Sequence, residues 1–480
     1  MDKRWAQTEQ IRQLRSREHG RPLPVGRQSL AMLYPASYRV GMASLGFQWI
    51  AHQLVESGLG VERAFLPDDR WGPDSGSVRS MESEKPLGDF PLIAATVAWE
   101  LELDALVRML ESSGIPALRA ERGPEHPAVL LGGPLTFSNP RPLGAIADAV
   151  LVGEADATAA PAALAFFAAG RPEWLDAVQA LPGGWIPGRS AAPPEPARAA
   201  DALLPARARL WSPDADFRDM FLVEAERGCS RGCAFCVMRR GPAQTMRLFE
   251  PARVLAAIPA EAPRVGLVGA AVSDHPQLLG MLEALIAGGK GVGVSSLRAD
   301  RVARQPRLAE LLRRSGYQTL TIAADAPSER LRAAIHKDIR AEHLLACAAL
   351  AREHRFERVK LYTIIGLPDE GDEDVAELVE LVRAMAAIHP IDLAVSPFVP
   401  KQRTPLAQAP FAGIKAVESR LAVLKKSLRG VAGLRPTSAR WAWVEAELAA
   451  GDEATGEAAV RAVRAGGKFS AWKRALAGRG

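Results

Sequence analysis

Residues 226–236 read Glu-Arg-Gly-Cys-Ser-Arg-Gly-Cys-Ala-Phe-Cys and carry three of the four cysteines of the chain, Cys229, Cys233 and Cys236. Thiolate is the soft ligand that iron–sulfur clusters require. Three thiolates at this spacing can hold three corners of a cubane [4Fe-4S] cluster, and they leave one iron without a protein ligand. A glycine precedes each of the first two cysteines and suits a loop around a cluster, because glycine tolerates positive φ and close backbone approach. An iron with an open position is a place where chemistry can occur.

Other uses of the three cysteines fit the spacing less well. Zinc prefers paired C-x₂-C knuckles and four ligands, and disulfides are rare in a cytosolic protein. An electron-transfer cluster is usually closed by four cysteines, and Cys347 is the remaining one. It lies in an Ala- and Leu-rich stretch, residues 344–350, that predicts a buried helix. We expect Cys347 to pack in the core as a small apolar residue.

The C-x₃-C-x₂-C pattern resembles the hallmark of the radical S-adenosylmethionine (SAM) superfamily. Phe235 fits as well, because the residue before the last cysteine is commonly aromatic in that family. The resemblance implies that SAM chelates the open iron through its amino and carboxylate groups. An electron from the reduced cluster then cleaves the sulfonium bond and gives a 5′-deoxyadenosyl radical. It also implies an external reductant of the flavodoxin or ferredoxin type.

The composition bounds the class of protein. A chain of 480 residues with 48% hydrophobic and 24% charged residues predicts a folded, soluble protein of two to four domains. No stretch of about 18 apolar residues indicates a membrane span. The charged N-terminus lacks the apolar region of a signal peptide, which predicts a cytoplasmic location. The net charge of +5 comes without a dense basic block and is weak evidence for nucleic acid.

Strand and helix patterns alternate in the first half of the chain. Strands are predicted at 30–34, 61–65, 92–97, 128–132 and 149–152, and helices at 46–57 and 101–113. This order predicts a doubly wound parallel sheet of the Rossmann or flavodoxin-like type. Residues 1–27 are predicted as a helical extension, 28–185 as this Rossmann-type domain, and the Pro- and Ala-rich residues 186–215 as a linker.

A second α/β region follows. Strands are predicted at 221–226, 264–268, 291–295, 319–323, 358–363 and 392–397, with helices between them. Six such units suit a partial (β/α)₆ barrel, which is the fold of the radical SAM core. The cysteine loop follows the first strand, at the mouth where barrels place their active sites. Residues 216–410 are predicted as this barrel and 411–480 as a small helical C-terminal region.

Polar or glycine-rich residues follow the later barrel strands. Many radical SAM enzymes hold the amino group of SAM with a Gly-Gly-Glu-type motif, where this chain has Gly269-Ala270-Ala271. A backbone carbonyl, Ser273 or Asp274 could take that place, and a helix cap is the alternative for Asp274.

Four further residues are candidate SAM contacts. Ser296 and Arg298 follow the third strand and can hydrogen-bond a ribose or a carboxylate. Asp325 ends the fourth strand, where a ribose or substrate contact competes with an N-cap. Gly366, after the fifth strand, lies in a segment that resembles the superfamily region contacting adenine through backbone.

The first domain suggests the subclass. Residues 128–134, Asn139-Pro140 and 147–156 resemble the cobalamin-binding-type domain of B12-dependent radical SAM proteins. The resemblance implies that cobalamin contacts Gly132, Gly133, Gly153 and Glu154. The Asp-x-His-x-x-Gly motif of many B12 proteins is absent, and we expect His52 to be a packing residue. A methylthiotransferase would need further cysteines in this domain, and no cysteine precedes Cys229.

These features predict a radical SAM enzyme with a [4Fe-4S] cluster, SAM and cobalamin as cofactors. The expected reaction is methyl transfer to an unactivated carbon of a small-molecule or natural-product-like substrate. A non-methylating rearrangement, cyclisation or oxidation is the first alternative. An RNA-modifying enzyme is the second, with nucleic acid as partner, because Trp441, Trp443 and Trp472 could stack on bases. Tryptophans at helical spacing are more often core residues.

Overall fold

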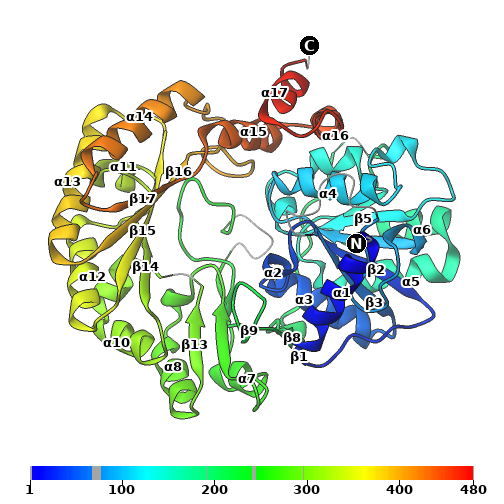
Figure 1. Ribbon diagram of the computed structural model, residues 1–480, viewed down its shortest axis with the longest axis horizontal. Coiled ribbons are helices and arrows are strands. Elements are labelled where there is room, and N and C mark those ends of the chain that lie inside the picture. The colour runs from blue at the N-terminus through cyan, green and yellow to red at the C-terminus, as the bar shows by residue number, and fades with distance from the viewer. Residues whose placement is uncertain (1–2, 68–76, 191, 240–244, 296, 479–480) are drawn as a thin grey trace. The chain divides into compact units, whose positions relative to one another are not determined.

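The chain divides into two units that are interleaved along the sequence. The structure is a computed structural model that describes residues 3–67, 77–190, 192–239, 245–295 and 297–478. Unit 1 comprises residues 1–222 and 447–480, and unit 2 comprises residues 223–446. The second unit is therefore inserted into the first, and Figure 1 follows the chain through both.

Unit 1 is built on a six-stranded sheet in the order β3-β2-β4-β5-β6-β7. The strands are β2 (Ser29–Tyr34), β3 (Gly60–Phe65), β4 (Leu92–Thr96), β5 (Ala128–Gly132), β6 (Ala149–Leu151) and β7 (Gly184–Trp185). All neighbours pair in parallel except β7, which is antiparallel to β6. The five parallel strands have the flavodoxin-like order, and its topological switch point lies between β2 and β4. The predicted doubly wound sheet is confirmed.

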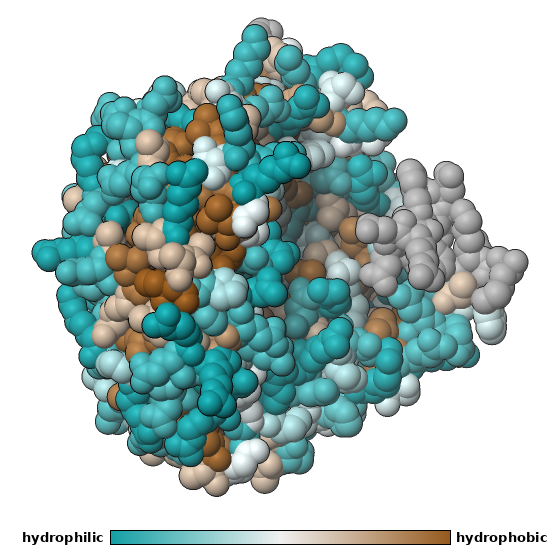
Figure 2. Space-filling model, turned by 60° about the vertical axis from the view of Figure 1, so that its left-hand side comes forward, coloured by the Kyte–Doolittle hydropathy of each residue, from teal (hydrophilic) through white to brown (hydrophobic). Residues whose placement is uncertain are grey.

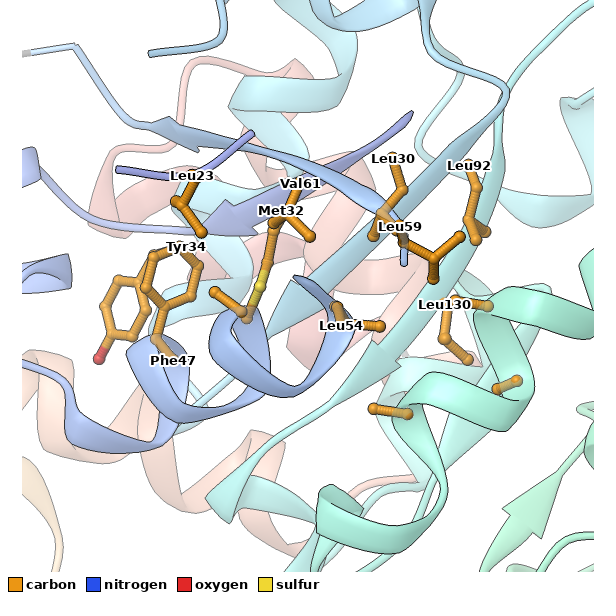
Figure 3. Packing of buried hydrophobic residues seen from close by; sticks show 14 of the residues in the cluster. Leu23, Leu30, Met32, Tyr34, Phe47, Leu54, Leu59, Val61, Leu92 and Leu130 are labelled. Carbon is orange, nitrogen blue, oxygen red and sulfur yellow. The ribbon is translucent and has the colours of Figure 1, made fainter. Parts of the chain in front are cut away.

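Helices cover this sheet and bury its strands. They are α1 (Lys3–Ser16), α2 (Tyr38–Gly41), α3 (Leu45–Glu56), α4 (Glu102–Ser112), α5 (Ala159–Ala169) and α6 (Arg171–Gln179). Every residue of β2 is buried, as expected for a parallel strand covered on both faces. Figure 3 shows Leu30 and Met32 of β2 packed with Phe47 and Leu54 of α3, in the core of unit 1.

The last helices of the chain also belong to unit 1. Helices α16 (Glu453–Arg464) and α17 (Phe469–Ala477) pack on each other, and α16 contacts α4 and the short helix η4 (Arg141–Ala145). The Asn139 side chain donates to the Ala449 and Gly451 carbonyls at 3.0 and 2.7 Å. The sequence pattern predicted these helices but not where they pack.

Residues 186–215, predicted as a linker, lie within unit 1. The short strand β8 (Leu210–Trp211) pairs with β1 (His19–Gly20), and Ala197 forms a parallel bridge with Gly153. The Arg207 guanidinium stacks 5.3 Å from the Trp49 ring centroid. These contacts tie parts of the segment to β1, to Gly153 and to α3.

Unit 2 contains two larger sheets, and helices run along the outer side of the one formed by β14 to β17, as Figure 1 shows. One sheet has the order β13-β12-β9 and the other the order β14-β15-β16-β17. The strands are β9 (Met220–Glu224), β12 (Arg264–Val268), β13 (Gly291–Val294), β14 (Thr319–Ala323), β15 (Arg358–Ile365), β16 (Ile391–Pro397) and β17 (Gly433–Pro436). The first six are the predicted barrel strands. A bridge between Arg298 and Ala323 joins the two sheets.

The helices of unit 2 alternate with these strands. They are α7 (Pro251–Ala256), α8 (Leu278–Ala287), α9 (Ala299–Arg304), α10 (Pro306–Arg314), α11 (Glu329–Ala334), α12 (Ala341–Glu353), α13 (Asp372–Ile388) and α14 (Ile414–Ser427). Helix α15 (Ala439–Ala450) leads back to unit 1. A seventh parallel strand, β17, lies in the region predicted as helical. It pairs with β16 after α14 and so continues the strand–helix alternation.

The surface is mostly hydrophilic on the face shown in Figure 2, with hydrophobic residues in smaller groups among the polar ones. Among the residues described, no helix is both long and apolar enough to cross a membrane. The mixed α/β class, with a Rossmann-like parallel sheet, a barrel-type region and a helical C-terminus, agrees with the sequence prediction.

Candidate functional site

The three cysteines of the motif lie on one loop of unit 2. The loop follows the short strand β10 (Glu226–Arg227), which pairs with β11 (Arg247–Leu248), and Gly228 enters it with φ of 86°. All three thiols are free; Cys233 is buried, and Cys229 and Cys236 are half-buried. Burial raises the pKa of the Cys229 and Cys236 thiols above the ordinary value. The Arg231 N–H donates to Cys229 Sγ at 3.4 Å.

These donors fit a cluster better than a single ion. No group of three His, Cys, Asp or Glu side chains in the described parts of the chain is placed to hold one metal ion. The three thiolates of a cubane cluster each bind a different iron, so they need not converge on one point. Soft thiolates on one glycine-containing loop are the donor set that the cluster requires.

The fourth cysteine takes no part in this loop. Cys347 lies on α12, is fully buried, and its thiol contacts the Ala299 carbonyl at 3.4 Å. Burial raises its pKa to about 12, so it remains a neutral thiol. Its predicted core position agrees with the structure.

Ion pairs to the buried Asp274 carboxylate fasten the cysteine loop to the segment that follows β12. Arg231 donates two hydrogen bonds to the Asp274 carboxylate, at 2.8 and 2.7 Å, and Arg301 donates a third at 2.6 Å. The Asp274 side chain is 3% exposed, and the two guanidinium groups hold the pKa of this carboxyl below its usual value. The Asp274 carboxylate, predicted as a SAM ligand or a helix cap, instead accepts hydrogen bonds from Arg231 and Arg301.

The other side of the loop is held by residues 335–336 and by an apolar cluster. The Ala234 N–H donates to the Ile335 carbonyl at 2.9 Å, and Cys233 Sγ lies 3.8 Å from the His336 carbonyl. Phe235 packs against a cluster that includes Leu367 and Phe398, both buried. The aromatic residue before the last cysteine thus anchors the loop in the core of unit 2.

Glu226 organises the segment that stands in place of a Gly-Gly-Glu motif. Its carboxylate accepts the Ala271 N–H at 2.6 Å, and the residue is completely buried. Ser295 Oγ donates to the Gly269 carbonyl at 2.8 Å and accepts the Gly269 N–H at 3.2 Å. Burial raises the pKa of Glu226 to about 7. Sequence reasoning missed Glu226, although its position three residues before the first cysteine was a usable signal.

Two of the residues predicted to contact SAM, Ser273 and Arg298, are hydrogen-bonded to each other. The buried Ser273 Oγ accepts the Arg298 N–H at 3.1 Å. The Arg298 guanidinium donates to Asp300 at 2.9 Å and to the Lys337 carbonyl at 3.0 Å. Ser296 lies outside the described residues.

Asp325 and Gly366 follow β14 and β15. Asp325 has a positive φ of 63° and forms an ion pair with Lys337. The Gly366 and Leu367 N–H groups donate to the Glu370 carboxylate at 2.8 and 3.2 Å. An adenine beside Gly366 would therefore find that amide already paired.

The residues expected to hold cobalamin make contacts within unit 1. A Cβ at Gly133 would lie 2.6 Å from the Val97 carbonyl, and one at Gly153 would lie 2.4 Å from the Ala197 nitrogen. The Glu154 carboxylate accepts the Ala199 N–H at 2.7 Å. These contacts fix the backbone at the carboxyl ends of β5 and β6. Gly132 ends β5, and a Cβ added there would make only ordinary contacts with Leu151.

Other side chains, not predicted from the sequence, lie at the switch point of the sheet between β2 and β4. Tyr34 ends β2, and the segment after β4 carries Trp99, whose side chain is 45% exposed. Glu102 accepts the Ala98 N–H there, and burial raises its pKa to about 7. His52 lies elsewhere: it stacks on Trp49 and contacts Arg209 at 3.2 Å, as expected for a packing residue.

The tryptophans near the C-terminus are not an exposed stacking surface. Trp472 is completely buried, and Trp441 and Trp443 are half-buried. The core position of Trp472 removes it from any base-stacking role.

Two family models match the chain. The model described as radical SAM proteins, N-terminal, matches residues 46–187, and that of the radical SAM superfamily matches residues 223–382. The second match includes the cysteine loop. Unit 2 is therefore similar to the radical SAM superfamily over residues 223–382, and unit 1 is similar to the N-terminal region of radical SAM proteins over residues 46–187.

A curated relative and two solved structures are similar to the chain. Uncharacterized protein MJ0966 of Methanocaldococcus jannaschii is 35% identical over 193 residues, which are 38% of this chain and 41% of that protein. The cobalamin-dependent SAM radical enzyme OxsB, solved with aqua-cobalamin and SAM and with aqua-cobalamin, matches at TM-scores of 0.51 and 0.50. Both matches have 12% identity and cover 84% of this chain and 56% of OxsB. The OxsB likeness shows the fold, and the chain spans less than two thirds of either relative.

Proposed function

We propose that this protein is a radical SAM enzyme whose Cys229, Cys233 and Cys236 hold a [4Fe-4S] cluster with one open iron. The carrying observation is the placement of three free thiols on one anchored loop, with the fourth cysteine buried on α12. When bound, the cluster would supply the electron that cleaves SAM to a 5′-deoxyadenosyl radical. The protein would position the cofactors and exclude water.

The chain's own residues would serve this chemistry by fixing the loop. Asp274 holds Arg231 on one side, and the Ile335 carbonyl holds Ala234 on the other. Glu226 and Ser295 fix Gly269–Ala271 at the end of the neighbouring strand. Ser273, Arg298, Asp325 and Gly366 would line the SAM site from the following strand ends. Phe235 would support the loop from beneath.

The cysteine assignment has a direct test. Changing any one of Cys229, Cys233 or Cys236 to Ala should remove most iron and abolish 5′-deoxyadenosine formation after anaerobic reconstitution, because three thiolates are needed. Cys347→Ala is the matched control and should leave both intact. Iron content, visible absorbance and product chromatography measure the outcomes. Loss of the cluster in Cys347→Ala would refute an open iron.

We further propose cobalamin dependence and methyl transfer to an unactivated carbon of a small molecule, with a flavodoxin- or ferredoxin-type reductant. The flavodoxin-like strand order and the fold likeness to OxsB support this proposal. The corrinoid would lie at the carboxyl ends of the parallel strands, with Gly132, Gly133, Gly153 and Glu154 after β5 and β6 as its contacts and the switch point between β2 and β4 beside them. Reconstitution with hydroxocobalamin, followed by gel filtration and absorbance, should leave corrinoid on the protein. A preparation that retains none would refute this part alone.

A non-methylating rearrangement, cyclisation or oxidation is distinguished by its products. Methyl transfer gives a methylated product and S-adenosylhomocysteine beside 5′-deoxyadenosine, whereas the alternative gives 5′-deoxyadenosine alone.

An RNA substrate would require a salt-dependent shift of tRNA in a gel. The buried Trp472 weakens the RNA alternative.

A further inference from the structure

Helices α12 and α13 pack against one face of the sheet β14 to β17, and the opposite face is its inner face. Side chains alternate between the faces of a strand. Along β15, buried residues alternate with more exposed ones: Val359, Leu361, Thr363 and Ile365 are buried, and Arg358, Lys360, Tyr362 and Ile364 are partly or largely exposed. Because α12 and α13 pack against this sheet, the buried set faces the helices and the other set lines the inner face.

The strand register extends this face across the sheet. Lys360 is level with Thr321 of β14 and Asp392 of β16, and Asp392 is level with Gly433 of β17. Two residues further along the strands, Tyr362, Ala394 and Arg435 are level with one another on the same face. Polar and charged side chains therefore occupy positions that bulky apolar residues ordinarily fill in a barrel.

Positive charge exceeds negative charge on this face. Arg358 and Arg435 share the Asp392 carboxylate, at 3.3 and 3.0 Å. Lys360 Nζ lies 4.7 Å from the Tyr362 ring centroid, and no described carboxylate forms an ion pair with it. This face of the strands therefore carries three cationic side chains, those of Arg358, Lys360 and Arg435, and one carboxylate, that of Asp392. We call Arg358, Lys360, Tyr362, Asp392 and Arg435 the basic inner face.

The basic inner face is open. Tyr362 is 39% exposed, and the Arg435 side chain is 64% exposed. An unbalanced charge would be costly in a closed barrel, so its presence here requires solvent or an anionic ligand. An exposed aromatic ring beside two guanidinium groups and an ammonium group suits an organic anion, because guanidinium forks match carboxylate and phosphate geometry.

The same face leads to the cysteine loop. Ile364, four residues beyond Lys360 on the same side of β15, packs in the cluster with Phe235. At the rise of a β-strand, this separates Lys360 from the loop support by about 13 Å. A ligand of metabolite size could therefore place an anionic group on Lys360 and Arg435 and extend toward the loop.

We propose that the basic inner face binds the anionic end, a carboxylate or a phosphate, of the substrate. This inference rests on the proposed function, because the substrate is taken to react beside the cysteine loop. It assigns a substrate class that neither the family matches nor OxsB assigns to this chain.

The test measures anion binding to the full-length, reconstituted protein. Citrate and pyrophosphate, titrated by calorimetry, probe the carboxylate and phosphate cases. K360Q/R435Q should weaken binding of the preferred probe by about tenfold or more, because two charge-assisted contacts are lost. K425Q/K426Q removes the same charge from exposed positions on the outer helix α14 and should not change binding. Thermal unfolding of each variant verifies that the fold is retained.

The outcomes separate this inference from the proposed function. If the wild-type protein holds its cluster and cleaves SAM but binds neither probe, the basic inner face is wrong and the radical SAM assignment stands. Equal binding by K360Q/R435Q and the wild-type protein also overturns the inference. If the wild-type protein binds a probe on this face but forms no cluster, the proposed function fails instead.

Discussion

Gly269 has no room for a side chain. A Cβ at this position would lie 2.2 Å from Glu226 Oε1 and 2.8 Å from the Glu226 carbonyl. We expect Gly269→Ala to displace Glu226 from the Ala271 N–H and to lower the free energy of unfolding by roughly 1–3 kcal/mol. Urea denaturation measures the change.

Gly280 provides the matched control. It lies within α8, and no atom stands within 4 Å of the place that an alanine Cβ would take there. Because alanine favours a helix over glycine by about 1 kcal/mol, Gly280→Ala should stabilise the protein. Equal and small effects of the two substitutions would contradict the tight contact between Gly269 and Glu226.

For individual residues, the sequence predicted features set by neighbouring positions, but not hydrogen bonds between residues far apart in the chain. The cysteine loop is visible in eight consecutive residues, and Cys347 in an apolar helix is equally local. Glu226 meets Ala271 across 45 positions, and Glu154 meets Ala199 across another 45. No periodicity connects residues so far apart, so their contacts became visible only in the folded chain.

Among the elements, the short helix η7 (Val272–Asp274) anchors the cysteine loop through Asp274. Asp274→Asn keeps the shape but loses the charge that holds Arg231 and Arg301. We expect it to cost about 1–3 kcal/mol of loop anchoring and to speed iron loss to a chelator several-fold. Iron release, followed by absorbance, measures this effect.

The matched control for Asp274 is Glu310→Gln on α10. Glu310 pairs with Arg307 at 2.6 Å, but both side chains are substantially exposed. Exposed pairs contribute little, so iron release should be unchanged. Similar release from Asp274→Asn and Glu310→Gln would exclude Asp274 as the anchor.

Helix α4 begins with a carboxyl group that makes stability depend on pH. Burial raises the Glu102 pKa from 4.5 to about 7, so the folded state binds this proton more tightly than the unfolded state. The free energy of unfolding should therefore fall as pH rises from about 4.5 to about 7, by at most about 3 kcal/mol from this group. Glu102→Gln should flatten the fall, since the amide oxygen still accepts the Ala98 N–H.

Thermal unfolding across this pH range, compared between the variant and the wild-type protein, checks the prediction. Glu173→Gln, which changes an exposed carboxyl in the first turn of α6, should leave the pH profile unchanged. A Glu102→Gln profile parallel to that of the wild-type protein would rule out this carboxyl as the source.

Long strands with clear alternation were predictable, and short ones were not. β15 runs for eight residues with a regular pattern of burial, whereas β17 has four residues and β7 has two. Elements this short carry too few residues for a periodic signal, and they exist because a neighbouring strand pairs with them.

For the whole molecule, unit 1 should depend on the end of the chain. Trp472 is fully buried in α17, and loss of such a side chain alone costs roughly 3–5 kcal/mol. A fragment of residues 1–222 should therefore unfold without a cooperative transition. Joining residues 447–480 to it through a flexible linker should restore that transition in calorimetry. Cooperative unfolding of residues 1–222 alone would contradict this dependence.

The insertion of unit 2 between two parts of unit 1 has a consequence for synthesis. A ribosome makes residues 223–446 before it makes α16 and α17, so the nascent sheet of unit 1 waits for its last helices while the barrel emerges. During that interval the surfaces of α4 and η4 that α16 later covers are open to chaperones and proteases. Pauses in translation before residues 447–480 are made should therefore increase proteolysis and misfolding of unit 1 more than of unit 2.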